Sequence, residues 1–275
     1  MDYDAVFAHF CETHPRTVQQ IDGAEWQYIA CGHGATTLVL LPGGFGLAET
    51  AFRYVLACEP ACRVIAVTSP TTISTVAGLT DGLACLLRRN RVERAHVLGG
   101  SYSGMVAQCF VRRYPALVHT LILSHTGAPR PSRARWSQAC MALLEVLPMP
   151  LLRGMLRLMN YGFLPGHTPE QRFWRRHFAR MIDKTTRADY LNRLHVLQDF
   201  DRNYRFTPDD LRDHAVPILL IEAARDGMVG EHERAALRQL YPAARRHVFP
   251  QGSHAETVTR PEAEIDVIMH WIAAH

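Results

Sequence analysis

Short apolar runs alternate with amphipathic stretches along most of this chain. Runs typical of strands buried on both faces of a sheet occur at 37–41, 64–67, 95–100, 120–123 and 216–223. Helical patterns end near residues 89 and 114 and recur at 231–241, and a further strand at 246–249 precedes a closing helix at 261–274. This alternation predicts an α/β fold, a mostly parallel sheet with helices on both faces.

Two parts of the chain depart from that alternation. Residues 4–11 predict a short helix, and two extended runs at 16–21 and 26–31 are separated by Asp22-Gly23, a typical hairpin turn. Between residues 128 and 213 the strand signal disappears, and helical patterns broken by prolines replace it. We therefore predict one main domain in two parts, residues 1–127 and 214–275, with a helical cap inserted at 128–213.

The segment from Ala95 to Gln108 carries the strongest chemical signal. A buried strand ends in two glycines, and Ser101 follows immediately at the start of a helical pattern. A serine on such a sharp turn projects its hydroxyl out of the sheet, and the crowded backbone accepts only small residues two places before and after it. Gly99 and Ser103 occupy those places. Ser103 stands where glycine is usual, and its side chain either only crowds the turn, which we favour, or orients a substrate or the catalytic residues through its hydroxyl.

Two later residues complete a Ser–Asp–His order along the chain. Asp226 follows the strand at 216–223, and His254 lies in the last loop before the closing helix. Both follow strands at the carboxyl edge of the predicted sheet, where active-site crevices form. Ser101, His254 and Asp226 are therefore predicted to act as nucleophile, general base and orienting acid. The backbone N–H groups of Tyr102 and Gly44 are the predicted oxyanion donors, with Phe45 the alternate for Gly44.

These motifs resemble the α/β-hydrolase superfamily along nearly the whole chain, from Thr37–Gly43 through the elbow to Gly252-Ser253-His254. The resemblance implies an α/β-hydrolase fold and a serine hydrolase that cleaves an ester or thioester of a small, apolar acyl substrate through an acyl-enzyme. Within the superfamily the chain is similar to the maspardin-like group in Leu41-Pro42, at 52–66 and at 104–110. That similarity implies the alternative, a non-catalytic adaptor on the same fold with a protein partner.

Composition narrows the remaining classes of function. Seven cysteines without a C-x-x-C pair, no signal pattern and no apolar run of spanning length predict a cytoplasmic protein without a transmembrane segment. Gly44-x-Gly46-x-x-Glu49 places an acid where a dinucleotide fingerprint needs glycine, and the histidines lack metal-binding spacings. We therefore predict no cofactor, no metal and no nucleic acid as partner, and leave the oligomeric state open.

The predicted cap is basic and carries an apolar stripe. Residues 128–200 hold twelve arginine or lysine residues against five acidic ones, within a chain of net charge +4. At 149–164 apolar residues recur at helical spacing, which fits packing of the cap, a pocket wall for an acyl chain, or a surface for a membrane or partner. Our hypothesis is that Phe45 and Met155 or Met159 contact an apolar acyl group.

Overall fold

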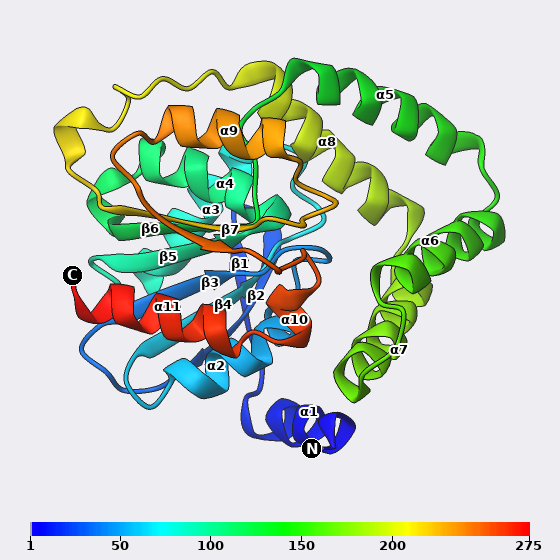
Figure 1. The fold of residues 1–275 in the computed structure, drawn as a ribbon, viewed down its shortest axis with the longest axis horizontal. Coiled ribbons are helices and arrows are strands. Elements are labelled where there is room, and N and C mark those ends of the chain that lie inside the picture. Colours follow the sequence, from blue (N-terminus) through cyan, green and yellow to red (C-terminus); the bar gives the residue numbers. More distant parts are fainter. Residues whose placement is uncertain (1) are drawn as a thin grey trace.

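A computed structural model describes residues 2–275 and places one eight-stranded sheet at the centre of the molecule (Figure 1). The strand order is β1-β2-β4-β3-β5-β6-β7-β8. The strands are β1 (Thr17–Ile21), β2 (Ala24–Cys31), β3 (Thr37–Leu41), β4 (Arg63–Thr68), β5 (Ala95–Gly100), β6 (Val118–Ser124), β7 (Ile218–Ala223) and β8 (Arg245–Phe249).

One strand of this sheet, β2, runs opposite to the other seven. β1 and β2 form an antiparallel hairpin whose turn residues, Asp22 and Gly23, have positive φ angles of 49° and 78°. β2 also pairs antiparallel with β4, whereas every pairing from β4 to β8 is parallel. The predicted α/β-hydrolase fold, a mostly parallel sheet flanked by helices, is confirmed.

Helices cover both faces of the sheet (Figure 1). One face carries α3 (Val76–Arg89), α4 (Ser101–Arg113) and α9 (Glu231–Leu240), and the other carries α2 (Phe52–Cys58) and α11 (Glu262–Ala273). The hydrophobic pattern does not predict α2, because seven residues make only about two helical turns. The core also has helix α1 (Tyr3–Thr13), the single turn α10 (Glu256–Thr259) and 3₁₀ turns at Ala48–Ala51, Pro115–Leu117 and Arg212–His214.

The core consists of two apolar layers, one on each face of the sheet. Strand β3 contributes to both: Leu38 and Leu40 pack into the layer under α2 and α11, and Val39 and Leu41 into the layer under α3 and α4. Successive side chains of a strand point to opposite faces, so a strand buried on both sides must be apolar throughout. This burial explains why continuous apolar runs mark the central strands.

Four helices lie between β6 and β7, in the stretch where the sequence predicts the cap. These inserted helices are α5 (Pro131–Val146), α6 (Met149–Phe163), α7 (Pro169–Lys184) and α8 (Arg187–Asn203), and they lie to one side of the sheet in Figure 1. Tyr3 of α1 reaches them and donates a hydrogen bond to Glu170 of α7, 2.6 Å away. Among the described residues, none of the helices combines the length and hydropathy that crossing a membrane requires.

Candidate active site

The turn between β5 and α4 holds Ser101 in a strained backbone conformation. Its φ of +48° lies in the left-handed region, which a residue with a side chain occupies only when its surroundings enforce it. Here the enforcing contacts are close: a Cβ atom on Gly99 would lie 2.6 Å from Cβ of Ala107, so only glycine fits there. The hydroxyl of Thr126 donates to the Ser101 carbonyl at 2.7 Å and fixes the turn from the other side.

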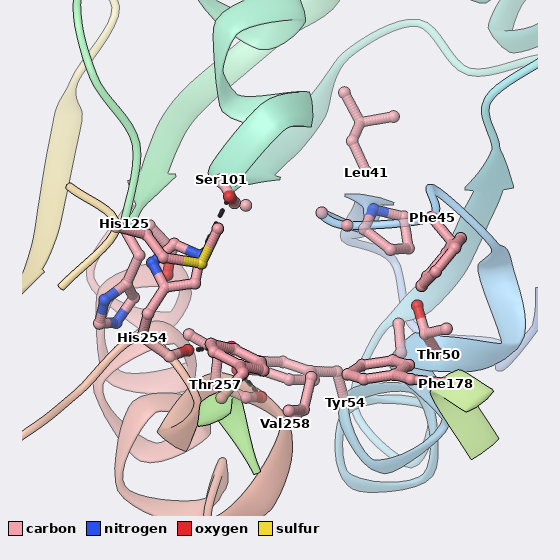
Figure 2. Close-up of a pocket in the computed structure, with 18 of the residues that line it drawn as sticks. Leu41, Phe45, Thr50, Tyr54, Ser101, His125, Phe178, His254, Thr257 and Val258 are labelled. Carbon is pink, nitrogen blue, oxygen red and sulfur yellow. Dashed lines mark hydrogen bonds between the residues drawn. The ribbon is translucent and has the colours of Figure 1, made fainter. Parts of the chain in front are cut away.

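Ser101, His254 and Asp226 form one hydrogen-bonded path. His254 Nε2 lies 3.0 Å from Ser101 Oγ, and His254 Nδ1 lies 2.8 Å from Asp226 Oδ2. Figure 2 shows the first of these bonds at one end of the cavity, with Phe45 and Phe178 on the other side. The three residues follow β5, β8 and β7, so parallel strands deliver them to the same edge of the sheet.

The carboxylate of Asp226 is buried but well supplied with donors. Its Oδ1 accepts the backbone N–H groups of Met228 and Val229, each at 2.8 Å, while Oδ2 faces His254. Burial alone would raise the pKa of Asp226, but hydrogen bonds from His125, His254 and the backbone hold that pKa well below its usual range. Asp226 is therefore ionised at neutral pH and can stabilise a positive charge on His254.

A second histidine, not predicted from the sequence, lies against the same carboxylate. His125 Nδ1 is 3.3 Å from Asp226 Oδ2, and His125 Nε2 is 3.7 Å from Oε2 of the buried Glu264. Glu264 also accepts a 2.6 Å hydrogen bond from Ser124. Burial alone would lower the pKa of His125, but its hydrogen bonds with Asp226 and Glu264 raise it to about 9. The buried cluster thus pairs one positive imidazolium with two carboxylates.

The sequence carries a signal for one of these residues only. His125 directly follows the strand β6, just as Ser101 follows β5, and it too has a positive φ of 48°. A polar residue at that position of a parallel sheet belongs to the same edge as the nucleophile. Glu264 gives no comparable signal, because an acid in the first turn of a helix is ordinarily explained by the helix dipole.

The loop after β3 passes directly beside Ser101. A Cβ atom on Gly43 would lie 2.9 Å from Ser101 Cβ, and Gly44 has a φ of +60°. The Gly43 carbonyl accepts a hydrogen bond from the N–H of Gly46 at 3.0 Å. The Gly44 N–H belongs to the same trans peptide group as that carbonyl, so it points in the opposite direction, away from Gly46. Tyr102 lies in the first turn of α4, where backbone N–H groups have no partner within the helix. Both predicted oxyanion donors are therefore next to the nucleophile.

Two side chains tie this loop to its neighbours. Ser103 is buried, and its hydroxyl donates a hydrogen bond to the Pro42 carbonyl at 2.6 Å. Its side chain therefore does more than crowd the turn. From the inserted helices, Arg193 of α8 donates to the carbonyls of Gly44, at 3.2 Å, and of Phe45. The sequence gives no way to find Arg193, since it is one of twelve basic residues in its segment.

A largely apolar cavity of about 590 Å³ lies between this edge of the sheet and the inserted helices. Phe45 and Met159 line it, whereas Met155 does not, so the structure favours Met159 over Met155 as the methionine that could contact an acyl group. The two methionines are four residues apart on α6 and both are exposed, but the residues of this helix that line the cavity include Leu156, Met159 and Phe163. Other apolar lining residues are Leu41, Tyr54, Phe178, Ile182, Met228 and Val258.

A group of potential metal ligands lies outside this cavity. One nitrogen of His14, the sulfur of Cys31 and a carboxylate oxygen of Glu59 all lie within 4.8 Å of one another. None of the three lines the cavity around Ser101. The spacing of these residues in the sequence shows no metal motif, because they come from three different elements that only the fold brings together.

Comparison with known proteins agrees with the geometry. The model of the Alpha/beta hydrolase family matches residues 38–267. A pimeloyl-[acyl-carrier protein] methyl ester esterase of Aeromonas hydrophila is 24% identical over 186 residues, 66% of this chain and 71% of that protein. A 2-hydroxy-6-oxononadienedioate/2-hydroxy-6-oxononatrienedioate hydrolase of Paraburkholderia phymatum is 25% identical over 250 residues, 82% and 83% of the two chains. The crystal structure of a hydrolase from Pseudomonas aeruginosa aligns with a TM-score of 0.79 at 20% identity, covering 94% and 98% of the two chains.

Proposed function

This chain belongs to the alpha/beta hydrolase family, and we propose that it is a serine esterase that hydrolyses an ester or thioester of a small, apolar acyl group. The observation that carries the proposal is the path of hydrogen bonds from Ser101 through His254 to Asp226, which opens into the cavity. A nucleophile, a base and an orienting acid in contact are the parts that acyl transfer requires.

In the first half of the reaction, Ser101 Oγ attacks the carbonyl carbon and its proton passes to His254 Nε2. The negative charge of Asp226 stabilises the imidazolium that forms. The carbonyl oxygen becomes an oxyanion, which the backbone N–H groups of Tyr102 and Gly44 stabilise. The N–H of Phe45 is the alternative to that of Gly44. Collapse breaks the bond to the leaving alkoxide or thiolate, which takes the proton from His254, and leaves the acyl group on Ser101.

In the second half, a water molecule replaces the leaving group. His254 Nε2 accepts a proton from the water while its oxygen attacks the acyl carbon, and the same donors stabilise the second oxyanion. Collapse releases the carboxylic acid and returns the proton from His254 to Ser101 Oγ. The enzyme is regenerated, and the net reaction is the hydrolysis of one ester bond by one molecule of water.

The lining of the cavity supports an apolar acyl group. Apart from the cluster around Ser101 and His254, its walls are mainly aliphatic, aromatic and methionine side chains. Transfer of an acyl chain from water into such surroundings is favourable, by about 0.8 kcal/mol for each methylene. We propose that residues 128–213 act as the cap over this cavity, since α6 and α7 supply Met159 and Phe178 to its wall.

The proposal is tested with an acyl-ester series and an active-serine probe. Wild-type protein should react with a fluorophosphonate and hydrolyse p-nitrophenyl esters from acetate to decanoate. Ser101→Ala should lose the labelling and lower the rate by roughly 10⁴- to 10⁶-fold, the scale seen for a lost triad nucleophile. Ser132→Ala, which changes an exposed serine of α5, is the matched control and should behave as wild type.

The alternative is a maspardin-like adaptor that keeps the fold and binds a protein partner without turnover. Under that hypothesis, correctly folded wild-type protein would neither react with the fluorophosphonate nor hydrolyse any ester of the series. Labelling by the fluorophosphonate without ester hydrolysis would still favour the esterase over the adaptor, because labelling requires an activated Ser101. It would mean that the esters of the series do not match the substrate. Absence of labelling in protein with a cooperative unfolding transition would reject the esterase proposal.

A further inference from the structure

We propose that His14, Cys31 and Glu59 form a binding site for a divalent cation of the zinc type, separate from the active site. They come from the carboxyl ends of three elements: His14 follows α1, Cys31 is the last residue of β2, and Glu59 follows α2. Cys31 pairs with Val64 near the start of β4, so this site lies at the edge of the sheet opposite the edge that carries Ser101. The proposal does not depend on the proposed esterase function.

The three side chains offer ligands that suit this class of cation. An imidazole nitrogen, a thiolate and a carboxylate are all zinc ligands, and three protein ligands leave a fourth position for water. Their ligand atoms lie within 4.8 Å of one another, with His14 Nε2 and Glu59 Oε2 only 2.9 Å apart. Ligands of a tetrahedral zinc lie roughly 3.4–3.6 Å apart. Small side-chain rotations would therefore suffice to close the site.

The ring of His14 is already oriented for coordination through Nε2. Its Nδ1 lies 2.8 Å from Thr13 Oγ1, whose own hydrogen is donated to the His9 carbonyl at 2.9 Å. With that hydrogen on the His9 carbonyl, Thr13 Oγ1 can accept from His14 Nδ1, and Nε2 is then the nitrogen that faces Glu59 and would bind the cation. The ring also stacks on Phe10, with centroids 4.4 Å apart. A fixed ring with the second nitrogen hydrogen-bonded is the arrangement that metal-binding histidines use.

The contact between His14 and Glu59 is the part of the cluster that a cation would take over. His14 Nε2 and Glu59 Oε2 lie 2.9 Å apart, within hydrogen-bond distance, and a cation bound here takes the place of the shared hydrogen. A shared cation turns that contact into two coordinate bonds and adds the Cys31 sulfur as a third. The side chains of His14 and Glu59 are 11% and 25% exposed, so the site is desolvated and still open to a solvent ion.

A cation here would fasten α1 to the body of the molecule. Tyr3 of α1 bonds to Glu170 of α7, and the ring of Phe7 packs on His177 of α7 with centroids 4.7 Å apart. Helix α7 in turn supplies Phe178 to the wall of the active-site cavity. The inferred role is a structural clip: it holds the helix on which α7 rests, without contact with the reacting groups.

The test uses cobalt(II) as a spectroscopic substitute for zinc in the full-length protein after treatment with a chelator. Wild-type protein should bind one equivalent and show the near-ultraviolet charge-transfer band that reports a thiolate–cobalt bond, and zinc should abolish the band by displacement. Cys31→Ser should lose the band. Cys11→Ser, which removes an exposed cysteine from α1, is the matched control and should keep it.

Two further variants test the orientation of the ligands. Glu59→Gln should weaken cobalt binding at least about tenfold, and Thr13→Val, which removes the hydroxyl beside His14 Nδ1, should weaken it by roughly 10- to 100-fold. Zinc should raise the melting temperature of the wild type but not of Cys31→Ser, because only a folded site binds it. A wild type without the charge-transfer band, or a band of equal strength in Cys31→Ser, would overturn the proposal.

Discussion

At the scale of single residues, Ser103 shows how one hydroxyl changes the reading of a motif. It occupies the place where this turn usually has glycine, and the structure gives it a buried 2.6 Å hydrogen bond to the Pro42 carbonyl. That carbonyl belongs to the loop that carries the predicted oxyanion donor Gly44. Ser103 therefore links the helix of the nucleophile to the loop opposite.

This link predicts a loss of activity when the hydroxyl is removed. Ser103→Ala should lower kcat/KM about tenfold and the free energy of unfolding by about 1–3 kcal/mol, because the buried carbonyl of Pro42 loses its partner. Ester hydrolysis and denaturant unfolding measure the two effects. Ser103→Gly separates the interpretations: it should be as impaired as the alanine variant, whereas relief of crowding would make it equal to or faster than wild type.

At the scale of elements, α6 shows what helical periodicity leaves undecided. The apolar stripe at 149–164 correctly indicates a helix, but periodicity alone does not say which side of the stripe faces the cavity. Met155 and Met159 are both part of that stripe, and only Met159 lines the cavity. The choice depends on how the helix is rotated about its axis, which the packing of α6 against α7 determines.

The two methionines provide a matched pair for testing the acyl site. Met159→Ala should flatten or shift the dependence of kcat/KM on acyl length, since each buried methylene, worth about 0.8 kcal/mol, changes the rate roughly fourfold. Met155→Ala should keep the wild-type dependence, because its side chain does not line the cavity. The measurement is kcat/KM from acetyl to decanoyl esters. An identical series for all three proteins would remove Met159 from the acyl site.

Helix α8, like α6 and α7, connects the inserted helices to the region around Ser101. Arg193 donates to the carbonyls of Gly44 and Phe45, and so orients the two peptide groups that follow Gly44. Arg193→Met should lower kcat roughly tenfold, about 1.4 kcal/mol of transition-state stabilisation, with KM nearly unchanged. Arg202→Met is the control on the same helix, since Arg202 is exposed and bonds to Gln138. A rise in KM at constant kcat would instead assign Arg193 to substrate binding.

The central strands and the sharp turn at Ser101 are the features that the sequence predicts well. Strands buried on both faces must be continuously apolar, and the turn around Ser101 admits few residue types, so both constraints are local. His125, Glu264 and Arg193 could not be assigned in the same way. Each matters through a partner more than 100 residues away, Asp226, Ser124 and Gly44 respectively, and only the packed fold brings such partners together.

At the scale of the whole molecule, the charges around Asp226 make stability depend on pH. His125 has its pKa raised to about 9 in the folded protein, against about 6.5 for an exposed histidine. The folded state therefore keeps a proton that the unfolded state has lost between those values. This contribution to stability is fully present below pH about 6.5 and disappears as the pH rises through about 9.

The prediction is a difference between wild type and His125→Gln that shrinks with pH. At pH 6.5 the wild type should be more stable by on the order of 2 kcal/mol, equivalent to about 4–8 °C in melting temperature, and the gap should narrow toward pH 9.5. Comparing the two proteins at each pH cancels the titration of groups that both share. If the difference in melting temperature between the two proteins stays constant from pH 6.5 to 9.5, His125 is not protonated beside Asp226 and Glu264.

The pairing of β6 with β7 has a consequence for how the chain assembles. Leu121 and Ile218 are register partners, so all of the inserted helices form one excursion between neighbouring strands. The entropic free-energy cost of closing a loop grows only with the logarithm of its length, by about 0.6 kcal/mol for each doubling. Lengthening the excursion thus costs the sheet little, provided that the side chains that α7 and α8 bury in the two core layers, such as Trp174 and Phe200, are kept. Natural variation can remodel the wall of the cavity while the strand ends that hold Ser101, Asp226 and His254 keep their register.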